Sequence, residues 1–338
     1  MLVMRPVRLA DLPNVQQLAV DSPVGVTSLP DNTDRLRERI LASEASFAGE
    51  VRFHGEESYL FVLEDTDSGS LVGCSGIVAS AGFSEPFYSF RNETFVHASR
   101  ELSVHNKVHV LSLCHDLTGH SLLTGFYIKP ELVAGRFAEL NSRGRLLFIA
   151  SHPDRFADVL VTEIVGYSDD ANESPFWNGV GRNFFNISYP EAEELSSRKS
   201  RTFLAEVMPH YPLYVPLLSG GAQEAMASVH PRAQASFDIF MREGFESDRY
   251  IDIFDGGPTL QARTAGIRSI ARSSEANVLV GNTIHSTRSF LVINGEVSDF
   301  RAVVAELDWE PGAPATLTPE IADALAVGEG ASVRLVAL

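Results

Sequence analysis

The chain has 338 residues, of which 44% are hydrophobic and 21% charged. This is the composition of an ordinary soluble globular protein, and the length favours two domains. The formal net charge of −17 argues against nucleic-acid binding, which requires a basic surface. The charge would attract a cationic small substrate, although an acidic surface that only maintains solubility explains it more simply. With no apolar run long enough for a membrane span and no signal-peptide core, we expect a cytoplasmic protein without membrane contact.

Hydrophobic periodicity predicts the elements in chain order. Strands are expected over residues 1–8, 58–65, 71–82, 92–99, 107–114, 121–128, 158–167 and 249–257. Helices are expected over residues 10–20, 34–47, 144–156, 174–185, 221–229 and 231–243. Asn32 or Thr33 is a plausible cap for the second helix and Ser174 for the fourth. The mixture of helices with several antiparallel-looking strands favours an α/β fold with a mixed sheet.

After about residue 266 the sequence changes character. Short strands are expected over residues 289–295, 300–310, 314–319 and 332–338, with one short helix over 320–327 that closes at Gly328. This pattern predicts a small C-terminal β-barrel of about 70 residues. We therefore place one domain over residues 1–265 and a second over 266–338.

The segment "VHPRAQASFDIFMREGF" (229–245) places a histidine at the start of a helix. Pro231 suits the first helical turn, which makes His230 the N-cap, and Gly244 suits the position just after the helix. Histidine is a weak cap, however, so another role for His230 is indicated. A helix N-terminus disfavours imidazolium and would keep His230 neutral at pH 7.

Several longer stretches carry a resemblance to a known family. They are "VTSLP" (26–30), "FVHASREL" (95–102), "ESPFWNGVGRNFF" (173–185), "AEVMPHYPLYVPLL" (205–218), "VHPRA" (229–233) and "REGFESDRYIDIFDGGPTL" (242–260). The chain resembles, over essentially its whole length, the arginine N-succinyltransferase family. Within that family it is most similar to the α subunits of heteromeric bacterial enzymes that act on arginine or ornithine.

The resemblance implies the fold of the Gcn5-related acyltransferases, a mixed sheet splayed open for the pantetheine arm of coenzyme A. It implies a double-psi-like barrel at the C-terminus, where "ALAVGEGASVRLVAL" (324–338) carries the likeness. It also implies a homologous β subunit, or further copies of the chain, as partner. The implied reaction moves the succinyl group of succinyl-CoA to the α-amino group of L-arginine or L-ornithine, with no permanently bound cofactor.

The family assigns the histidine of its "VHP" motif, here His230, as a proton donor. The helix dipole works against an imidazolium donor unless a carboxylate offsets it, and it would suit a neutral base. The resemblance also implies coenzyme A contacts at Phe126 and Tyr127 on the strand "SLLTGFYIKP" (121–130). Both directions of proton transfer stay open at this point.

The chain departs from the family at the phosphate-binding turn. Where the full family pattern is R-x-x-G-x-G, residues 133–138 read "VAGRFA", which places side chains where backbone amides would hold a pyrophosphate. A substitute is "NSRGRLLF" (141–148), with Arg143 and Arg145 as charge partners and Gly144 allowing close approach. The alternative is that these arginines belong to an ordinary helix start.

Substrate recognition needs further charges. An arginine suits the succinyl carboxylate, and Arg91 is one candidate. Glu93, Asp169 and Asp255 are candidates for the cationic acceptor, although "DGGP" (255–258) is equally well explained as a tight turn. The loop 21–32, with Ser28, lies where this fold commonly lines the acceptor pocket.

Two other classes of function remain. The altered turn agrees with a non-catalytic or partly catalytic subunit that supports a sister chain, and a related acyltransferase with another acyl donor is the third possibility. Cys74 and Cys114 lack an adjacent base and lie in apolar runs, so we expect reduced core thiols. The histidines lack metal-ligand spacing, so no metal site is expected.

Overall fold

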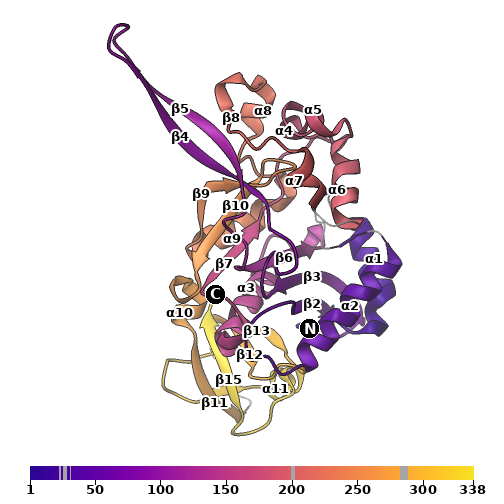
Figure 1. Ribbon diagram of the computed structural model, residues 1–338. Coiled ribbons are helices and arrows are strands. Elements are labelled where there is room, and N and C mark those ends of the chain that lie inside the picture. Colours follow the sequence, from indigo (N-terminus) through magenta and orange to yellow (C-terminus); the bar gives the residue numbers. More distant parts are fainter. Residues whose placement is uncertain (23, 26–28, 31, 199–201, 282–287) are drawn as a thin grey trace.

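One mixed sheet organises the molecule (Figure 1). The structure is a computed structural model that describes residues 1–22, 24–25, 29–30, 32–198, 202–281 and 288–338. Its sheet has 15 strands in the order β14-β11-β15-β12-β13-β1-β2-β3-β6-β7-β10-β9-β4-β5-β8. Neighbours are antiparallel except β6 with β7 and β11 with β14, which are parallel. The predicted α/β class with a mixed sheet is confirmed.

The bounds of the elements are as follows. The strands are β1 (Leu2–Pro6), β2 (Ser58–Asp65), β3 (Ser70–Val78), β4 (Ser89–Ser99), β5 (Val104–Cys114), β6 (Ser121–Ile128), β7 (Val159–Glu163), β8 (Leu213–Tyr214), β9 (Glu246–Ile251), β10 (Pro258–Arg263), β11 (Ser274–Val280), β12 (Ser289–Asn294), β13 (Ala302–Glu306), β14 (Ala315–Leu317) and β15 (Ser332–Ala337). The α-helices are α1 (Leu12–Asp21), α2 (Thr33–Ala48), α3 (Arg136–Ser151), α4 (Pro175–Gly179), α5 (Arg182–Phe185), α6 (Tyr189–Arg198), α7 (Thr202–Val207), α8 (Gly220–Ala225), α9 (Gln234–Glu243), α10 (Arg268–Arg272) and α11 (Pro319–Leu325).

Helices cover both faces of the central strands. Leu60 and Val62 of β2 pack into a cluster with residues of α1 and α2, whereas Phe61 between them packs with residues of α3. Consecutive strand residues point to opposite faces, so a strand buried on both faces must be apolar throughout. This explains the unbroken apolar run in "SYLFVLED".

Two predicted helices differ from those observed. The helix expected over 144–156 begins eight residues earlier, at Arg136, so the segment 141–148 is helix interior and not a substitute phosphate turn. The helix expected over 174–185 is divided into α4 and α5 at Val180, which has non-helical backbone angles. The expected caps are confirmed, because the Asn32 side chain accepts from Arg35 N–H and that of Ser174 from Trp177 N–H.

The C-terminal strands continue the sheet. β13 pairs with β12 on one side and with β1, at Met4, on the other, so its second edge joins the N-terminal sheet. Among the described residues these strands do not close into a barrel, which corrects the barrel expected from the sequence. Their core is shared with α11, which packs through Ile321 and Leu325. The division of the chain into two domains after residue 265 stays a prediction.

The sheet opens between β6 and β7. In these parallel strands only residues 121–123 of β6 pair with residues 160–162 of β7. Beyond this point β6 continues to Ile128 without β7 beside it. On its other edge β6 stays paired with β3, with an irregularity opposite Gly125, whose φ is +61°. The result is a split in the sheet that faces the helix following His230.

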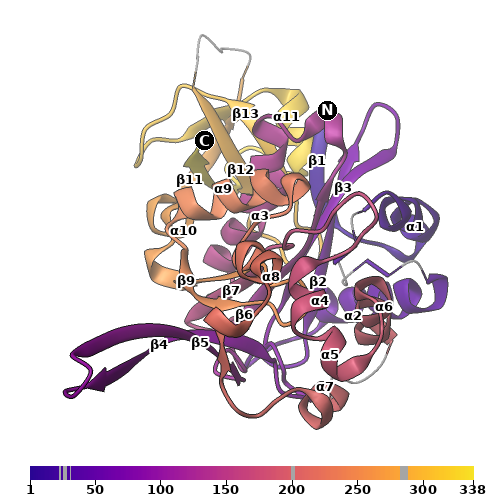
Figure 2. The same ribbon diagram turned by 90° about the horizontal axis from the view of Figure 1, so that it is seen from above.

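A long two-stranded ribbon projects from the body (Figures 1 and 2). β4 and β5 are paired along their whole length, from Ser89 opposite Cys114 at the base to Ser99 opposite Val104 at the tip. β9 supports only Phe90 and Arg91, and β8 only Val110 and Leu111, so the outer part has no third strand among the described residues. We name residues 94–109 the arm. The sequence predicted the strands but not their projection, because alternation does not show what a strand packs against.

Candidate functional site

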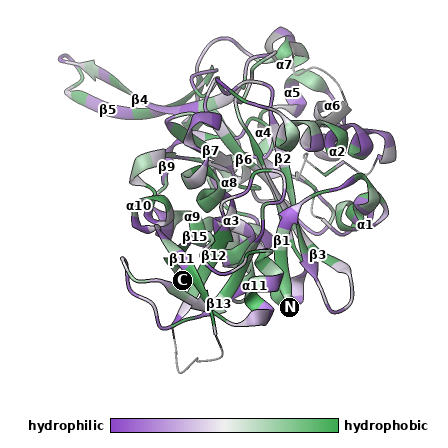
Figure 3. Ribbon diagram, turned by 90° about the horizontal axis from the view of Figure 1, so that it is seen from below, coloured by the Kyte–Doolittle hydropathy of each residue, from purple (hydrophilic) through white to green (hydrophobic). Residues whose placement is uncertain are grey.

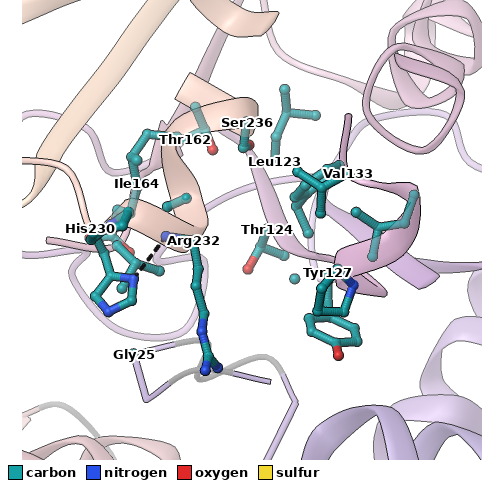
Figure 4. Close-up of a pocket in the computed structure, with 18 of the residues that line it drawn as sticks. Gly25, Leu123, Thr124, Tyr127, Val133, Thr162, Ile164, His230, Arg232 and Ser236 are labelled. Atoms are coloured by element: carbon teal, nitrogen blue, oxygen red, sulfur yellow. Dashed lines mark hydrogen bonds between the residues drawn. The ribbon is translucent and has the colours of Figure 1, made fainter. Parts of the chain in front are cut away.

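A large pocket lies in the split of the sheet (Figure 4). It has a volume of about 820 Å³. Its lining residues come from the end of α1, β6 and the turn after it, β7, and the segment that begins at His230. An opening of this size suits a ligand of cofactor dimensions.

His230 is held at this pocket by backbone contacts. Its N–H donates to Val165 O at 2.9 Å, next to an isolated bridge between Gly166 and Val229. Its imidazole Nδ1 accepts a hydrogen bond from the backbone N–H of Arg232 at 3.2 Å, so the predicted N-cap is confirmed. The capped element is a short 3-10 helix, Pro231–Ala233, that leads directly into α9.

This contact assigns the tautomer of His230, and the surroundings of the ring determine its charge. Because Nδ1 accepts, the proton of the neutral imidazole is assigned to Nε2. Burial, and secondarily the positive charge of Arg232, lower the pKa of His230 below its usual value of 6.5. At neutral pH the side chain is therefore an uncharged hydrogen-bond donor through Nε2.

Phe126 and Tyr127 both line the pocket, on the part of β6 that β7 leaves unpaired. Arg145 lies beneath them and is fully buried, which lowers its pKa to about 9. Its guanidinium donates to the carbonyl oxygens of Gly76 and Thr124, both at 3.1 Å, and lies over the rings of Phe126 and Phe240. Arg145 therefore supports the irregular part of β6 from below.

The other two residues predicted from the segment 141–148 lie elsewhere. Arg143 is buried in an ion pair with Glu243 at 3.0 Å, and it also donates to Ser269 Oγ and Ala337 O. Gly144 faces Met4, where a Cβ atom would overlap the sulfur. Neither lines the pocket, so a contact with coenzyme A stays a prediction that this placement does not favour.

The predicted substrate residues do not gather at the split. Arg91 pairs with Asp116 at 2.7 Å and with Glu93 at 3.2 Å, at the base of the ribbon. Glu93 also accepts from Ser112 Oγ, which lowers its pKa. Neither residue lines the pocket, and Ser28 lies outside the described residues. Their roles stay predictions.

The turn after β6 is the part of the pocket farthest along the strand. It is a short 3-10 helix, Pro130–Leu132, followed by Val133 and by Gly135 as the N-cap of α3. Val133 lines the pocket, whereas the Arg136 side chain turns to Glu306 at 3.2 Å. The departure from the family's turn is thus at the pocket itself.

A second, small pocket adjoins the first. It has about 30 Å³ and shares Gly25, Glu163, Ile164 and Val165 with the large pocket. Four carboxylates line it, from Glu163, Glu193, Asp252 and Asp255. The sequence named only Asp255 of these; the others are scattered along the chain, and only the fold brings them together.

Asp255 both makes a turn and lines this pocket. Its carboxylate accepts from Gly166 N–H at 2.7 Å, Gly257 N–H at 2.8 Å and Tyr189 Oη at 3.3 Å. Burial, and secondarily the charge of Asp252, raise the pKa of Asp255 to about 8. A Cβ atom at Gly166 would lie 2.5 Å from Asp255 Oδ1, so this close approach requires glycine.

Other classes of site find no support among the described residues. Cys74 is fully buried, which raises the pKa of its thiol to about 12, and both cysteines are free. A thiol with so high a pKa is not a nucleophile at neutral pH. In the described ranges no three His, Cys, Asp or Glu side chains are grouped to hold a metal ion. None of the helices described is long and apolar enough to cross a membrane.

The geometry defines an α/β protein with a cofactor-sized pocket in a split sheet and a neutral histidine at its edge. The family models for "Arginine N-succinyltransferase beta subunit" and for the C-terminal domain of that subunit match residues 2–269 and 272–337. The chain belongs to the arginine N-succinyltransferase family, whose members are acyltransferases.

Relatives match over the whole chain. "Arginine N-succinyltransferase subunit alpha" of Pseudomonas aeruginosa is 72% identical, with all of both chains covered. The "subunit beta" of that organism is 38% identical and covers all of this chain and 98% of its own. A solved structure of "arginine/ornithine succinyltransferase subunit AI" from P. aeruginosa has a TM-score of 0.93 at 70% identity, covering 100% of this chain and 98% of the other.

Proposed function

We propose that this chain transfers the succinyl group of succinyl-CoA to the α-amino group of L-arginine or L-ornithine, as in arginine catabolism. The products are the N2-succinyl amino acid and coenzyme A. The observation that carries the proposal is the pocket in the split between β6 and β7, with His230 at its edge. The diverging parallel strands support a Gcn5-related acyltransferase-like arrangement, in which the split admits the pantetheine arm.

The reaction needs no protein nucleophile. The lone pair of the substrate amine attacks the thioester carbonyl carbon, the carbon–sulfur bond breaks, and the proton lost by the amine balances the charge of the departing thiolate. Negative charge develops first on the carbonyl oxygen and then on sulfur. A donor aimed at that charge stabilises the transition state. The neutral His230 supplies such a donor at Nε2, since Nδ1 is engaged by Arg232 N–H.

The acidic pocket supports a cationic acceptor. Glu163 lines both pockets, so a substrate whose amine lies near His230 can extend its cationic side chain toward Glu193 and Asp252. A guanidinium or ammonium group is stabilised by carboxylates there, more strongly than in water because the site is partly buried. We assign this pocket to the side chain of arginine or ornithine.

Assembly with a homologous chain is the second part of the proposal. The arm exposes apolar side chains, with Leu102 75% and Val96 56% exposed, and Figure 3 shows hydrophobic residues along it. An isolated two-stranded ribbon is marginally stable in water. The relatives of 72% and 38% identity are named as subunits alpha and beta. We propose that the arm packs against such a sister chain.

Release of free thiol from succinyl-CoA by the purified chain, with L-arginine, L-ornithine or no acceptor, tests the function. Acceptor-dependent release is the expected result. Release only after the sister chain is added would favour the alternative of a partly catalytic subunit. Faster thiol release from another acyl-CoA would favour the alternative of a related acyltransferase that uses a different acyl donor.

A further inference from the structure

Among the described residues, Arg232 brings an unpaired positive charge into the pocket beside His230. Its backbone N–H donates to the capping Nδ1 of His230, but within the part of the chain that the structure describes its guanidinium makes no ion pair and no hydrogen bond. The side chain lines the pocket, and Figure 4 shows it extending between His230 and Tyr127 toward Gly25. A cation in this position is available to a ligand.

The other two cations that line the pocket differ from Arg232 in their contacts or their position. Arg145 is committed to carbonyl oxygens beneath β6. Lys129 follows the last residue of β6 and lies next to the turn that opens α3, so it stands at the end of the strand away from His230. Of the three, only Arg232 is placed beside His230 and so beside the reacting atoms of a bound thioester.

The charge of Arg232 affects the pKa of two neighbouring side chains. It contributes to the lowered pKa of His230, and it opposes the rise in the pKa of Tyr127 that burial causes. These residues come from different sides of the split, His230 from the start of the 3-10 helix that precedes α9 and Tyr127 from β6. The guanidinium therefore lies within electrostatic range of both walls.

We propose that the guanidinium of Arg232 forms a carboxylate-binding subsite beside His230. This inference rests on the proposed function. Two substrate carboxylates lie a short distance from the reacting atoms: the terminal carboxylate of the succinyl group and the α-carboxylate of the acceptor. Arginine binds either one through two parallel hydrogen bonds, which fixes its orientation as well as its position. Arg91, chosen from the sequence, is instead engaged by Asp116.

The test compares substrates that differ only in one carboxylate. Initial rates are measured for the wild-type chain, with its sister chain if activity requires it, and for Arg232→Gln. The donors are succinyl-CoA and butyryl-CoA, and the acceptors are L-arginine and agmatine, which lacks the α-carboxylate. Lys129→Gln is the matched control, because it also removes one unpaired pocket cation from an exposed or half-buried position.

We expect Arg232→Gln to lower kcat/KM about 10- to 100-fold, the range for losing charge-assisted hydrogen bonds to one carboxylate. The loss should disappear for the substrate that lacks that carboxylate: butyryl-CoA if the succinyl group is bound, or agmatine if the acceptor is. Lys129→Gln should affect both donors by the same factor. Arg232→Lys should recover only part of the loss, since it keeps the charge without the paired geometry.

Calorimetric titration of succinyl-CoA and butyryl-CoA without acceptor separates binding from chemistry. Equal losses for all substrate pairs in Arg232→Gln, with equal affinities for the two donors in wild type and variant, would overturn the subsite. Absence of turnover in the wild type with every donor would instead overturn the proposed function. The two failures are thus distinguishable.

Discussion

The backbone nitrogen of Arg232 lies 3.2 Å from Nδ1 of His230, and this hydrogen bond joins the start of a helix to the chemistry of the pocket. The Nδ1 atom of the imidazole accepts a hydrogen bond from an otherwise unpaired N–H of the first turn, while Nε2 remains available to a substrate. The structural and catalytic explanations of this histidine are therefore compatible, because they use different atoms of one ring.

Substitutions can separate these two roles. His230→Asn keeps an oxygen able to accept from Arg232 N–H but has no group at the Nε2 position, whereas His230→Ala removes both. We expect both variants to lose about 10²- to 10⁴-fold in kcat. Only the alanine variant should also lose stability, by about 0.5–2 kcal/mol. Thiol-release kinetics and chemical denaturation measure these effects; undiminished kcat in the asparagine variant would remove His230 from the reaction.

The lowered pKa of His230 gives a direction for its pH dependence. Protonation would place a hydrogen on Nδ1 opposite Arg232 N–H and a charge beside the guanidinium, so the neutral form should persist below pH 6.5. Its contribution to folding is complete above the unfolded-state pKa and is lost as pH falls through the folded-state pKa. NMR titration of the ring, assigned with His230→Asn, should give a pKa below 6.5. A value above 6.5 would contradict the assigned environment.

Local rules predicted much of what is local in this fold. The caps at Asn32 and Ser174, the position of Gly244 after α9, and the N-cap role of His230 all follow from short-range hydrogen bonding, and the structure confirms each. The mixed sheet followed from the order of elements. The family resemblance, confirmed by the full-length relatives, supplied the catalytic candidate and the expectation of a split sheet.

What the sequence could not give depends on tertiary contacts. Arg143 and Arg145 are neighbours in a basic stretch, yet both are buried and bonded, one to Glu243 and the other to carbonyl oxygens of β3 and β6. No local signal distinguishes such arginines from exposed ones. Arg232 lies within the "VHPRA" motif, but no local signal shows that its guanidinium lacks a partner among the described residues, because this depends on where the surrounding charges lie.

Arg143 should therefore act on stability and not on substrate binding. Arg143→Met leaves the buried Glu243 carboxylate without its cation, which we expect to lower the free energy of unfolding by about 3–5 kcal/mol. The KM for succinyl-CoA should stay unchanged below the unfolding transition. The double variant R143M/E243M, which removes both charges, should recover much of the stability. A raised KM in the folded single variant would return Arg143 to the cofactor site.

The acidic pocket can be tested through Glu193. The side chain is only 7% exposed and lines the pocket that we assign to the acceptor. Glu193→Gln removes one negative charge at nearly constant volume, so we expect KM for L-arginine to rise about tenfold with KM for succinyl-CoA little changed. Glu191→Gln is the control, because this exposed residue of the same helix bonds only Ser188 among the contacts seen. Equal effects of both variants would argue against a specific acceptor contact.

The arm offers a prediction about assembly that is independent of the pocket. Replacing residues 94–109 by Asn-Gly would close the ribbon at the Glu93–Val110 pair with a favoured two-residue turn. Little buried surface is lost, so the midpoint of thermal unfolding of the isolated chain should move by no more than about 2–4 °C. Light scattering should show that the shortened chain no longer associates with its sister chain.

L102S, which removes one exposed apolar contact at the tip, should weaken association by a smaller factor. Unchanged assembly in the shortened variant would show that the arm has another role.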